Sequence, residues 1–195
     1  HNNFMPLPRN HPAKAELSSE ARQLGTQELC QEFQIGYAPE GWDKLSQHLL
    51  SKGYKDEIMI LSGMSVRAKN GNLVDRFRGR ITWTIRDIQG RAVGFGARKL
   101  YSNDDGAKYL NSPETPIYKK NRILYNLERA RKSIVSEGYA IVVEGYTDVM
   151  ACWDAGVYNV VASSGTAFSD EHIEVLRRLL DGYEDGRVGQ IVFSF

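Results

Sequence analysis

The sequence predicts an α/β protein in which an α+β N-terminal part with a small antiparallel sheet precedes a parallel βαβαβ sheet. Two observations carry this prediction. Residues 81–96 alternate apolar and polar side chains around a glycine-containing turn at 87–90, as the strands of a β-hairpin do. From residue 139 onward, short apolar runs alternate with helical periodicity, which is typical of buried parallel strands joined by right-handed crossovers.

The length and composition are those of an ordinary globular protein. The chain has 195 residues, of which 42% are hydrophobic and 25% charged, enough for one substantial core or two small ones. No apolar run approaches the roughly 20 residues of a membrane-spanning helix, and the N-terminus lacks the pattern of a secretory signal. We therefore expect a cytoplasmic protein with no membrane partner. Two distant cysteines, Cys30 and Cys152, indicate neither a disulfide framework nor a cysteine-based metal site.

The net charge of +1 hides a segregation of charge along the chain. Residues 75–132 hold fourteen Lys and Arg against six Asp and Glu, a surplus of +8, which leaves −7 for the rest. A solvated surface can show such segregation by chance. A basic segment beside an acidic one is also how a protein holds a polyanion next to a cation site.

Short helices are expected in the first third of the chain. Residues 1–19 contain three prolines without periodicity, which predicts an extended arm. Residues 37–42 predict a turn, and we expect Trp42 on this turn to belong to the core. Apolar spacing and the glycines that follow it predict helices over residues 19–33, 42–52 and 55–62.

Strands become frequent from about residue 74 onward. The hairpin strands are expected at 81–86 and 91–96, and a loop over 101–115, because Asn111-Ser112-Pro113 forbids regular structure. A helix is expected at 124–133. The parallel unit is predicted to have strands at 140–143, 158–162 and 190–195 and helices at 147–155 and 169–180.

A pair of carboxylates stands where the first parallel strand meets its helix. In IVVEGYTDVM, residues 141–150, Glu144 ends the apolar run and Asp148 lies in the first turn of the helix. Ligands of open parallel sheets bind beyond the carboxyl ends of the strands, and paired carboxylates there are typical of a magnesium site. The alternative is that Asp148 complements the helix dipole and Glu144 is solvated.

The same motif, VEGYTDV at 143–149, resembles the first motif of the Toprim domain, which occurs in bacterial primases, topoisomerases and some nucleases. Four further motifs resemble, in the same order, the RNA polymerase domain of the bacterial replicative primase of the DnaG type. They are DRFRGR at 75–80, IRD at 85–87, GFGAR at 94–98 and KYLNSPET at 108–115. The resemblance covers residues 33–195.

The resemblance implies two domains and a metal cofactor. Residues 1–125 would be the N-terminal basic subdomain of the polymerase core, and residues 126–195 the first part of the Toprim domain, ending before the family's Asp-x-Asp motif. Glu144 and Asp148 would be catalytic and, with the aspartates of that later motif, would bind Mg²⁺ or Mn²⁺. Zinc is expected only in a module that precedes this part of the family.

The resemblance also implies a basic groove between the two domains. Arg98, Lys108 and Lys120 match its lining, where they can contact triphosphate and template phosphates. Arginines 76, 78 and 80 alternate along an extended segment, so at most some of them face the groove, and for Arg122 a solvated position is the alternative. The expected nucleotide and nucleic-acid contacts are Arg76, Arg78, Arg80, Arg98, Lys108, Tyr109, Asn111, Lys120 and Arg122.

The function implied is synthesis of RNA primers on single-stranded DNA from ribonucleoside triphosphates. We expect the replicative helicase and the single-strand-binding protein to be partners through regions outside these residues. Because the family's Asp-Gly-Asp motif would begin after Phe195, we expect this part of the enzyme to be inactive alone. The alternatives are another Toprim enzyme, a topoisomerase or nuclease, and a module that binds nucleic acid without catalysis.

Overall fold

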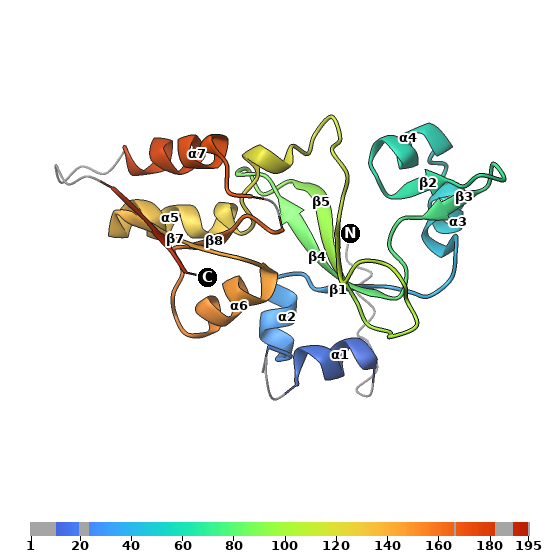
Figure 1. Ribbon diagram of the computed structural model, residues 1–195, viewed down its shortest axis with the longest axis horizontal. Helices are drawn as coiled ribbons and strands as arrows, with labels where there is room; N and C mark the ends of the chain where they lie inside the picture. The colour runs from blue at the N-terminus through green and yellow to red at the C-terminus, as the bar shows by residue number, and fades with distance from the viewer. Residues whose placement is uncertain (1–10, 20–23, 166, 182–188, 195) are drawn as a thin grey trace.

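The computed structural model describes residues 11–19, 24–165, 167–181 and 189–194. The molecule is elongated, with an antiparallel sheet in the middle, a parallel sheet at one end, and a lobe of two helices and two short strands at the other (Figure 1). The predicted combination of an antiparallel sheet with a following parallel sheet is therefore confirmed. Within the described ranges, no helix is long and apolar enough to cross a membrane.

The antiparallel sheet has four strands in the order β1-β4-β5-β6. These are β1 (Gly36–Ala38), β4 (Arg80–Arg86), β5 (Ala92–Lys99) and β6 (Tyr109–Asn111). The predicted hairpin is confirmed as β4 and β5. Two expectations were partly wrong. The first residues of the turn expected at 37–42 belong to β1, which pairs with β4, and the loop expected at 101–115 is interrupted by β6, which pairs with β5.

A buried carboxylate joins a helix and a strand within the lobe at the far end. The lobe consists of α3 (Lys44–Ser51), α4 (Asp56–Leu61), β2 (Ser65–Arg67) and β3 (Leu73–Asp75). Asp75 is 3% exposed, and its carboxylate accepts the backbone N–H groups of Leu45 and Ser46 at 2.7 and 2.8 Å and the Ser46 hydroxyl at 2.6 Å. Asp75 thus caps α3, whose own N-cap residue makes no side-chain cap.

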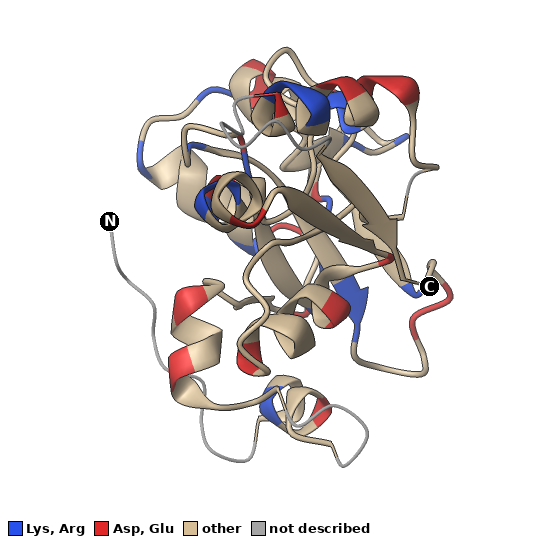
Figure 2. Cartoon of the chain, turned by 90° about the vertical axis from the view of Figure 1, so that its left-hand side faces the viewer, with Lys and Arg blue, Asp and Glu red and all other residues tan. Residues whose placement is uncertain are grey.

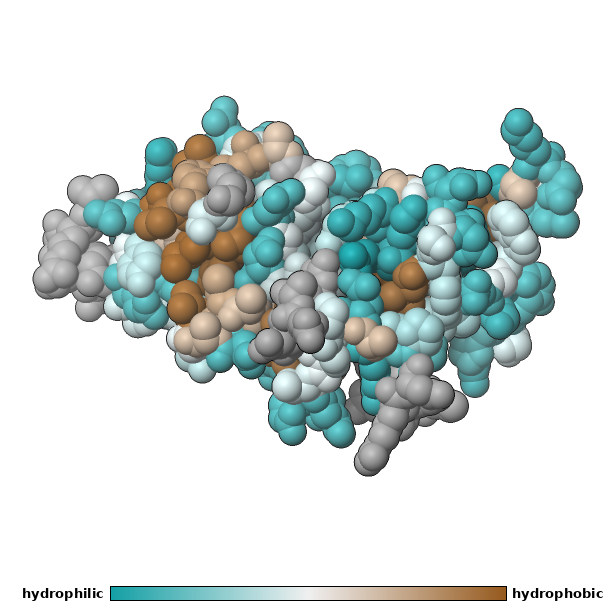
Figure 3. Space-filling model, turned by 60° about the horizontal axis from the view of Figure 1, so that its bottom comes forward, coloured by the Kyte–Doolittle hydropathy of each residue, from teal (hydrophilic) through white to brown (hydrophobic). Residues whose placement is uncertain are grey.

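The parallel sheet has the strand order β8-β7-β9 and confirms the predicted βαβαβ unit. Its strands are β7 (Tyr139–Val143), β8 (Val160–Ala162) and β9 (Gln190–Phe193), and its helices are α5 (Leu127–Glu137), α6 (Tyr146–Asp154) and α7 (Asp170–Leu180). The buried apolar residues form two clusters. Helices α5 and α7 pack with the sheet in one cluster, and α6 belongs to the second. Strand β9 exposes Val192 and Phe193, and the space-filling view shows a larger apolar area at this end than at the lobe (Figure 3).

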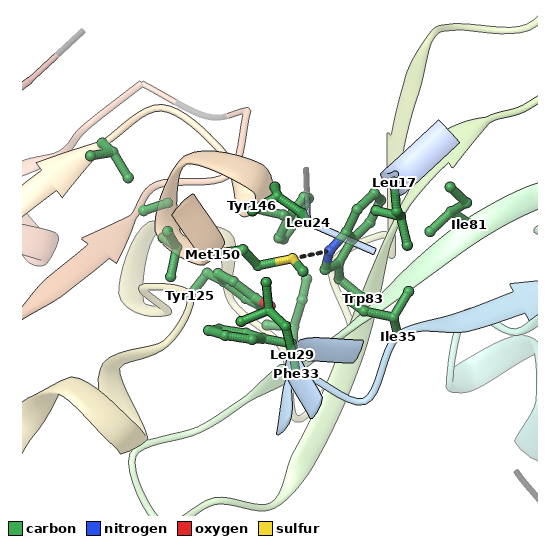
Figure 4. Close-up of a cluster of buried hydrophobic side chains, with 14 of the residues drawn as sticks. Leu17, Leu24, Leu29, Phe33, Ile35, Ile81, Trp83, Tyr125, Tyr146 and Met150 are labelled. Carbon is green, nitrogen blue, oxygen red and sulfur yellow. Dashed lines mark hydrogen bonds between the residues drawn. The ribbon is translucent and has the colours of Figure 1, made fainter. Parts of the chain in front are cut away.

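An aromatic cluster joins the two sheets. Trp83 of β4 stacks on Tyr146 of α6, with ring centroids 5.3 Å apart and planes 10° apart, and its indole N–H donates to the sulfur of Met150 at 3.3 Å (Figure 4). Tyr125 meets the Tyr146 ring edge-on at 4.7 Å. A Cβ at Gly96 would collide with the Tyr146 ring, so this glycine permits the close approach. Because these contacts span both sheets, α6 is held against the hairpin.

The N-terminal region contains a helix that the sequence did not predict. Residues 12–17 form α1 (Pro12–Leu17), so the extended arm expected over 1–19 was wrong for this part; residues 1–10 lie outside the described ranges. Proline suits the first turn because its missing N–H would be unpaired there, and the His11 side chain accepts the Ala13 N–H. Of the helices expected over 19–33, α2 (Gln27–Glu32) is present.

Candidate nucleic-acid and metal site

The two motif carboxylates lie at the junction of β7 and α6. Glu144 directly follows β7 and is exposed, and Asp148 is exposed in the first turn of α6. One Asp148 oxygen accepts the Gly145 N–H at 2.9 Å, which orients this carboxylate at the start of the helix. Both interpretations of the motif are therefore compatible with the geometry, since one oxygen caps the helix while both carboxylates face solvent.

The carboxylate oxygens of these two residues are the type of ligand that a hard divalent cation prefers. Magnesium prefers carboxylate oxygens and usually takes one or two from protein. Among the residues that the structure describes, no group of three or more His, Cys, Asp or Glu side chains lies close enough to hold a metal ion. Glu144 and Asp148 are therefore two candidate ligands, fewer than a complete coordination shell needs.

A basic edge with an aromatic ring lies on β5 and β6. Arg98 and Tyr109 are paired in register, and Tyr109 is 42% exposed. The Arg98 guanidinium carbon and the Lys108 ammonium nitrogen each lie 6.0 Å from the centroid of this ring. Arg98 also forms an ion pair with Glu16 of α1. An exposed ring between two cations can stack on a base while the cations contact phosphate.

Asn111 connects this edge to the carboxylate junction. Its amide nitrogen donates to the Ser164 carbonyl at 2.5 Å, and its amide oxygen accepts the Tyr146 hydroxyl at 2.8 Å. Its carbonyl accepts the Arg76 guanidinium at 3.0 Å. Arg76 is half-buried, and this burial lowers the pKa of its guanidinium. Because its amide atoms make these contacts, Asn111 holds β6 beside α6.

The half-buried Arg78 and the exposed Trp42 form a cation–π pair in the lining of a cavity. The Arg78 guanidinium lies 4.7 Å from the Trp42 ring centroid, and Trp42 is 69% exposed. The expectation that Trp42 belongs to the core was wrong, because α3 starts after it and leaves the indole on the surface. The cavity, of about 690 Å³, is lined by both residues together with Arg76, Arg80 and Tyr101.

Arg80 has a different environment from Arg78. It is 4% exposed, and its guanidinium donates to the Asp104 carboxylate at 2.7 Å and to the Ala107 carbonyl at 2.9 Å. The Gly106 N–H that Asp104 accepts, and then the Arg80 cation, hold the pKa of Asp104 below its usual range. Arg80 therefore fixes the loop before β6 and offers little surface to a ligand.

The last two predicted contacts lie on a single turn of 3₁₀ helix, η1 (Lys120–Arg122). Lys120 is half-buried and its backbone N–H donates to Glu114 at 2.7 Å, whereas Arg122 is exposed. The Lys120 carbonyl accepts a bond from His172 of α7 at 2.9 Å. Figure 2 looks onto the parallel-sheet end, where Lys, Arg, Asp and Glu all occur on the helices, so this end is not of one charge.

Sequence reasoning missed three residues that shape the site. Asp75, Glu16 and His172 are paired with groups far away in the chain. The DRFRGR motif contains Asp75 but does not indicate that it caps α3.

Family models match nearly the whole chain. The DNA primase catalytic core, N-terminal domain, matches residues 8–131, and the Toprim domain matches residues 138–194. The chain is 51% identical to the DNA primase of Streptomyces coelicolor over 169 residues, which is 87% of this chain and 26% of that protein. It is 46% identical to the DNA primase of Mycolicibacterium smegmatis over 188 residues, 93% of this chain and 29% of that one. The chain thus spans less than a third of these relatives.

Solved structures give the same result. The RNA polymerase domain of Mycobacterium tuberculosis primase DnaG, in complex with a double-stranded DNA oligomer with a 6-nucleotide overhang, superimposes with a TM-score of 0.88. It is 41% identical, and the match covers 96% of this chain and 57% of that one. A DnaG primase catalytic domain bound to single-stranded DNA matches with a TM-score of 0.78 and 35% identity, over 96% of this chain and 55% of the other. The motifs, the two sheets and these relatives agree, and the chain belongs to the bacterial DNA primase family.

Proposed function

We propose that this chain is part of a primase that copies single-stranded DNA into a short RNA primer from ribonucleoside triphosphates, with Mg²⁺ or Mn²⁺. One observation carries the proposal: Asn111 holds the basic β5–β6 edge beside the helix that bears the carboxylate junction. The related structures with bound DNA support it. We further propose a cytoplasmic location, a division between residues 125 and 126, and helicase and single-strand-binding protein as partners of the whole enzyme.

The proposed roles follow from exposure and charge. Glu144 and Asp148 would hold the divalent cation, which supplies a Lewis acid that favours ionisation of the attacking 3′-hydroxyl and stabilises charge on the α-phosphate. Lys108 and Lys120 would bind triphosphate oxygens, Arg98 would do so in exchange for its ion pair with Glu16, and the exposed Tyr109 ring would stack on a base. Template phosphates would lie along Arg76 and Arg78, with Arg122 further along the surface; Arg80 and Asn111 would position these groups.

The direct test is ribonucleotide incorporation on single-stranded DNA by a longer primase chain that continues past Phe195. We expect short RNA products that require a divalent cation. Strand cleavage would instead assign the chain to a topoisomerase or nuclease of the Toprim class. DNA binding without any product would leave a non-catalytic binding module.

Arg78→Gln is expected to weaken single-stranded DNA binding and to reduce its salt dependence. Each phosphate contact on a single strand contributes about 0.7 to the slope of log K against log salt, so the slope should fall by about that amount. The affinity itself should fall roughly two- to fivefold at low salt, as for an exposed ion pair. Fluorescence polarisation with a labelled oligonucleotide at several salt concentrations measures both.

The matched control for this change is Arg91→Gln. The Arg91 side chain is 75% exposed and lies at the opposite end of the β4–β5 hairpin from Arg80. The Arg91→Gln substitution should leave the slope of log K against log salt unchanged. An equal fall in both variants would mean that Arg78 acts only through the net charge of the chain.

A further inference from the structure

The N-terminal end of α7 is hydrogen-bonded to the 3₁₀ turn that contains Lys120. The His172 imidazole bonds the Lys120 carbonyl at 2.9 Å, and the Ser169 hydroxyl donates to the Asn121 carbonyl at 3.1 Å. The Asn121 amide donates to the Glu171 carboxylate at 3.0 Å. These bonds join a turn that follows the β6 segment to a helix of the parallel-sheet unit 48 to 52 residues away.

His172 is the buried member of this contact. It is 0% exposed, and both ring nitrogens have partners. A carbonyl can only accept, so Nε2 carries the proton and donates to Lys120; Nδ1 is then the acceptor for the Ser169 N–H at 3.2 Å. A neutral imidazole satisfies both bonds. A protonated one turns Nδ1 from the acceptor of the Ser169 N–H into a donor, which leaves the Ser169 hydroxyl, 3.3 Å away, to accept it.

The backbone of Lys120 is held from two sides. Its N–H donates to the Glu114 carboxylate at 2.7 Å, and its carbonyl accepts from His172. Glu114 lies three residues after β6, the strand that begins with Tyr109 and directly follows Lys108. Fixing both peptide groups of one residue restricts where its side chain can point, since the backbone dihedrals can no longer change freely.

We propose that His172 is a positioning residue that, in its neutral form, directs the Lys120 ammonium towards the triphosphate. This inference rests on the proposed function, in which Lys120 binds phosphate. It makes triphosphate affinity dependent on a side chain that touches neither nucleotide nor metal. The charge state of a single buried imidazole in the parallel-sheet unit then sets the binding strength of the basic edge.

The pH dependence has a defined sign. Burial lowers the pKa of His172, so the ring is neutral at pH 7. Glu171 on the same helix favours the protonated form, the Phe168 ring packs against the imidazole, and Lys120 presents its carbonyl oxygen. A lowered pKa means that the neutral contact is intact above about pH 6.5 and is lost as the pH falls through the lower folded value.

The test compares two substitutions at one position by calorimetric titration of a primase chain that continues past Phe195 with ATP and Mg²⁺. His172→Leu removes both bonds and is expected to weaken ATP binding about five- to tenfold at pH 7.5. His172→Gln can donate from its amide nitrogen and accept at its oxygen, so it should bind as the unaltered chain does. Between pH 7.5 and 5.5 the unaltered chain should lose more affinity than His172→Gln, in which only the nucleotide titrates.

The Lys120→Ala variant distinguishes a positioning role of His172 from a general loss of structure. In that background His172→Leu should have no further effect on ATP binding, because the two residues act through one contact. Equal weakening in both backgrounds, or equal pH profiles of the unaltered and Gln chains, would overturn the inference while the proposed function stands. Unchanged binding in Lys120→Ala alone would instead overturn the phosphate role of Lys120, and the inference with it.

Discussion

Glu144→Gln in a chain that continues past Phe195 should lose primer synthesis by about a thousandfold or more while keeping its affinity for single-stranded DNA. The amide has nearly the same size as the carboxylate but lacks its charge, so it is a poor ligand for a hard divalent cation. Glu144 is exposed at the end of β7, and the fold should therefore be unaffected. Incorporation of labelled ribonucleotide on an oligonucleotide template measures the loss.

Glu137→Gln is the matched control. This exposed glutamate is the last residue of α5 and lies at the opposite end of β7 from Glu144. The same change of charge there should leave incorporation within twofold of the unaltered enzyme, about 0.4 kcal/mol in barrier height. Full activity of Glu144→Gln would show that the junction has no part in the chemistry and would favour a helix-capping and solvent-exposed role for the motif.

Trp83→Ala should destabilise the protein by about 3–5 kcal/mol. Trp83 is 0% exposed, stacks on Tyr146 and lies among side chains from both sheets (Figure 4). Truncation would leave a cavity between the hairpin and α6, and Met150 would lose the indole N–H. Urea unfolding followed by circular dichroism gives the change in unfolding free energy.

Trp42→Ala is the control for the tryptophan itself. Because Trp42 is 69% exposed, its removal should change stability by no more than about 0.5 kcal/mol, although it removes the partner of Arg78. A loss below about 1 kcal/mol for Trp83→Ala would mean that the aromatic cluster does not hold the two sheets together.

The parts of the fold that could be predicted from the sequence have local signals. The β4–β5 hairpin shows alternation around a glycine turn, and the βαβαβ unit shows apolar runs separated by amphipathic helices. Strands β1 and β6 have three residues each, too few for a visible period, and they exist because β4 and β5 offer free edges. Tertiary pairing determines such short elements, and the sequence alone does not contain it.

The candidate site was likewise only partly predictable from the sequence. The motif correctly indicated that Glu144 and Asp148 both lie at a strand–helix junction, because only three residues lie between them in the sequence. The motifs did not show that Arg80 is buried against Asp104 while Arg78 is half-buried beside Trp42, although the two arginines are equivalent in the alternation. Partners supplied by distant loops decide which cation of a basic segment is available to a ligand.

The cap that Asp75 places on α3 has a consequence for protein engineering. Asp75 ends β3, and Arg76 and Arg78 follow at once, so the carboxylate that anchors the lobe also fixes the start of the arginine segment. Transplanting the arginines into another scaffold without α3 would remove the three donors of that carboxylate. The smallest portable part is therefore the lobe together with Arg76 and Arg78, residues 42 to 78, because Arg80 depends on Asp104 outside this segment.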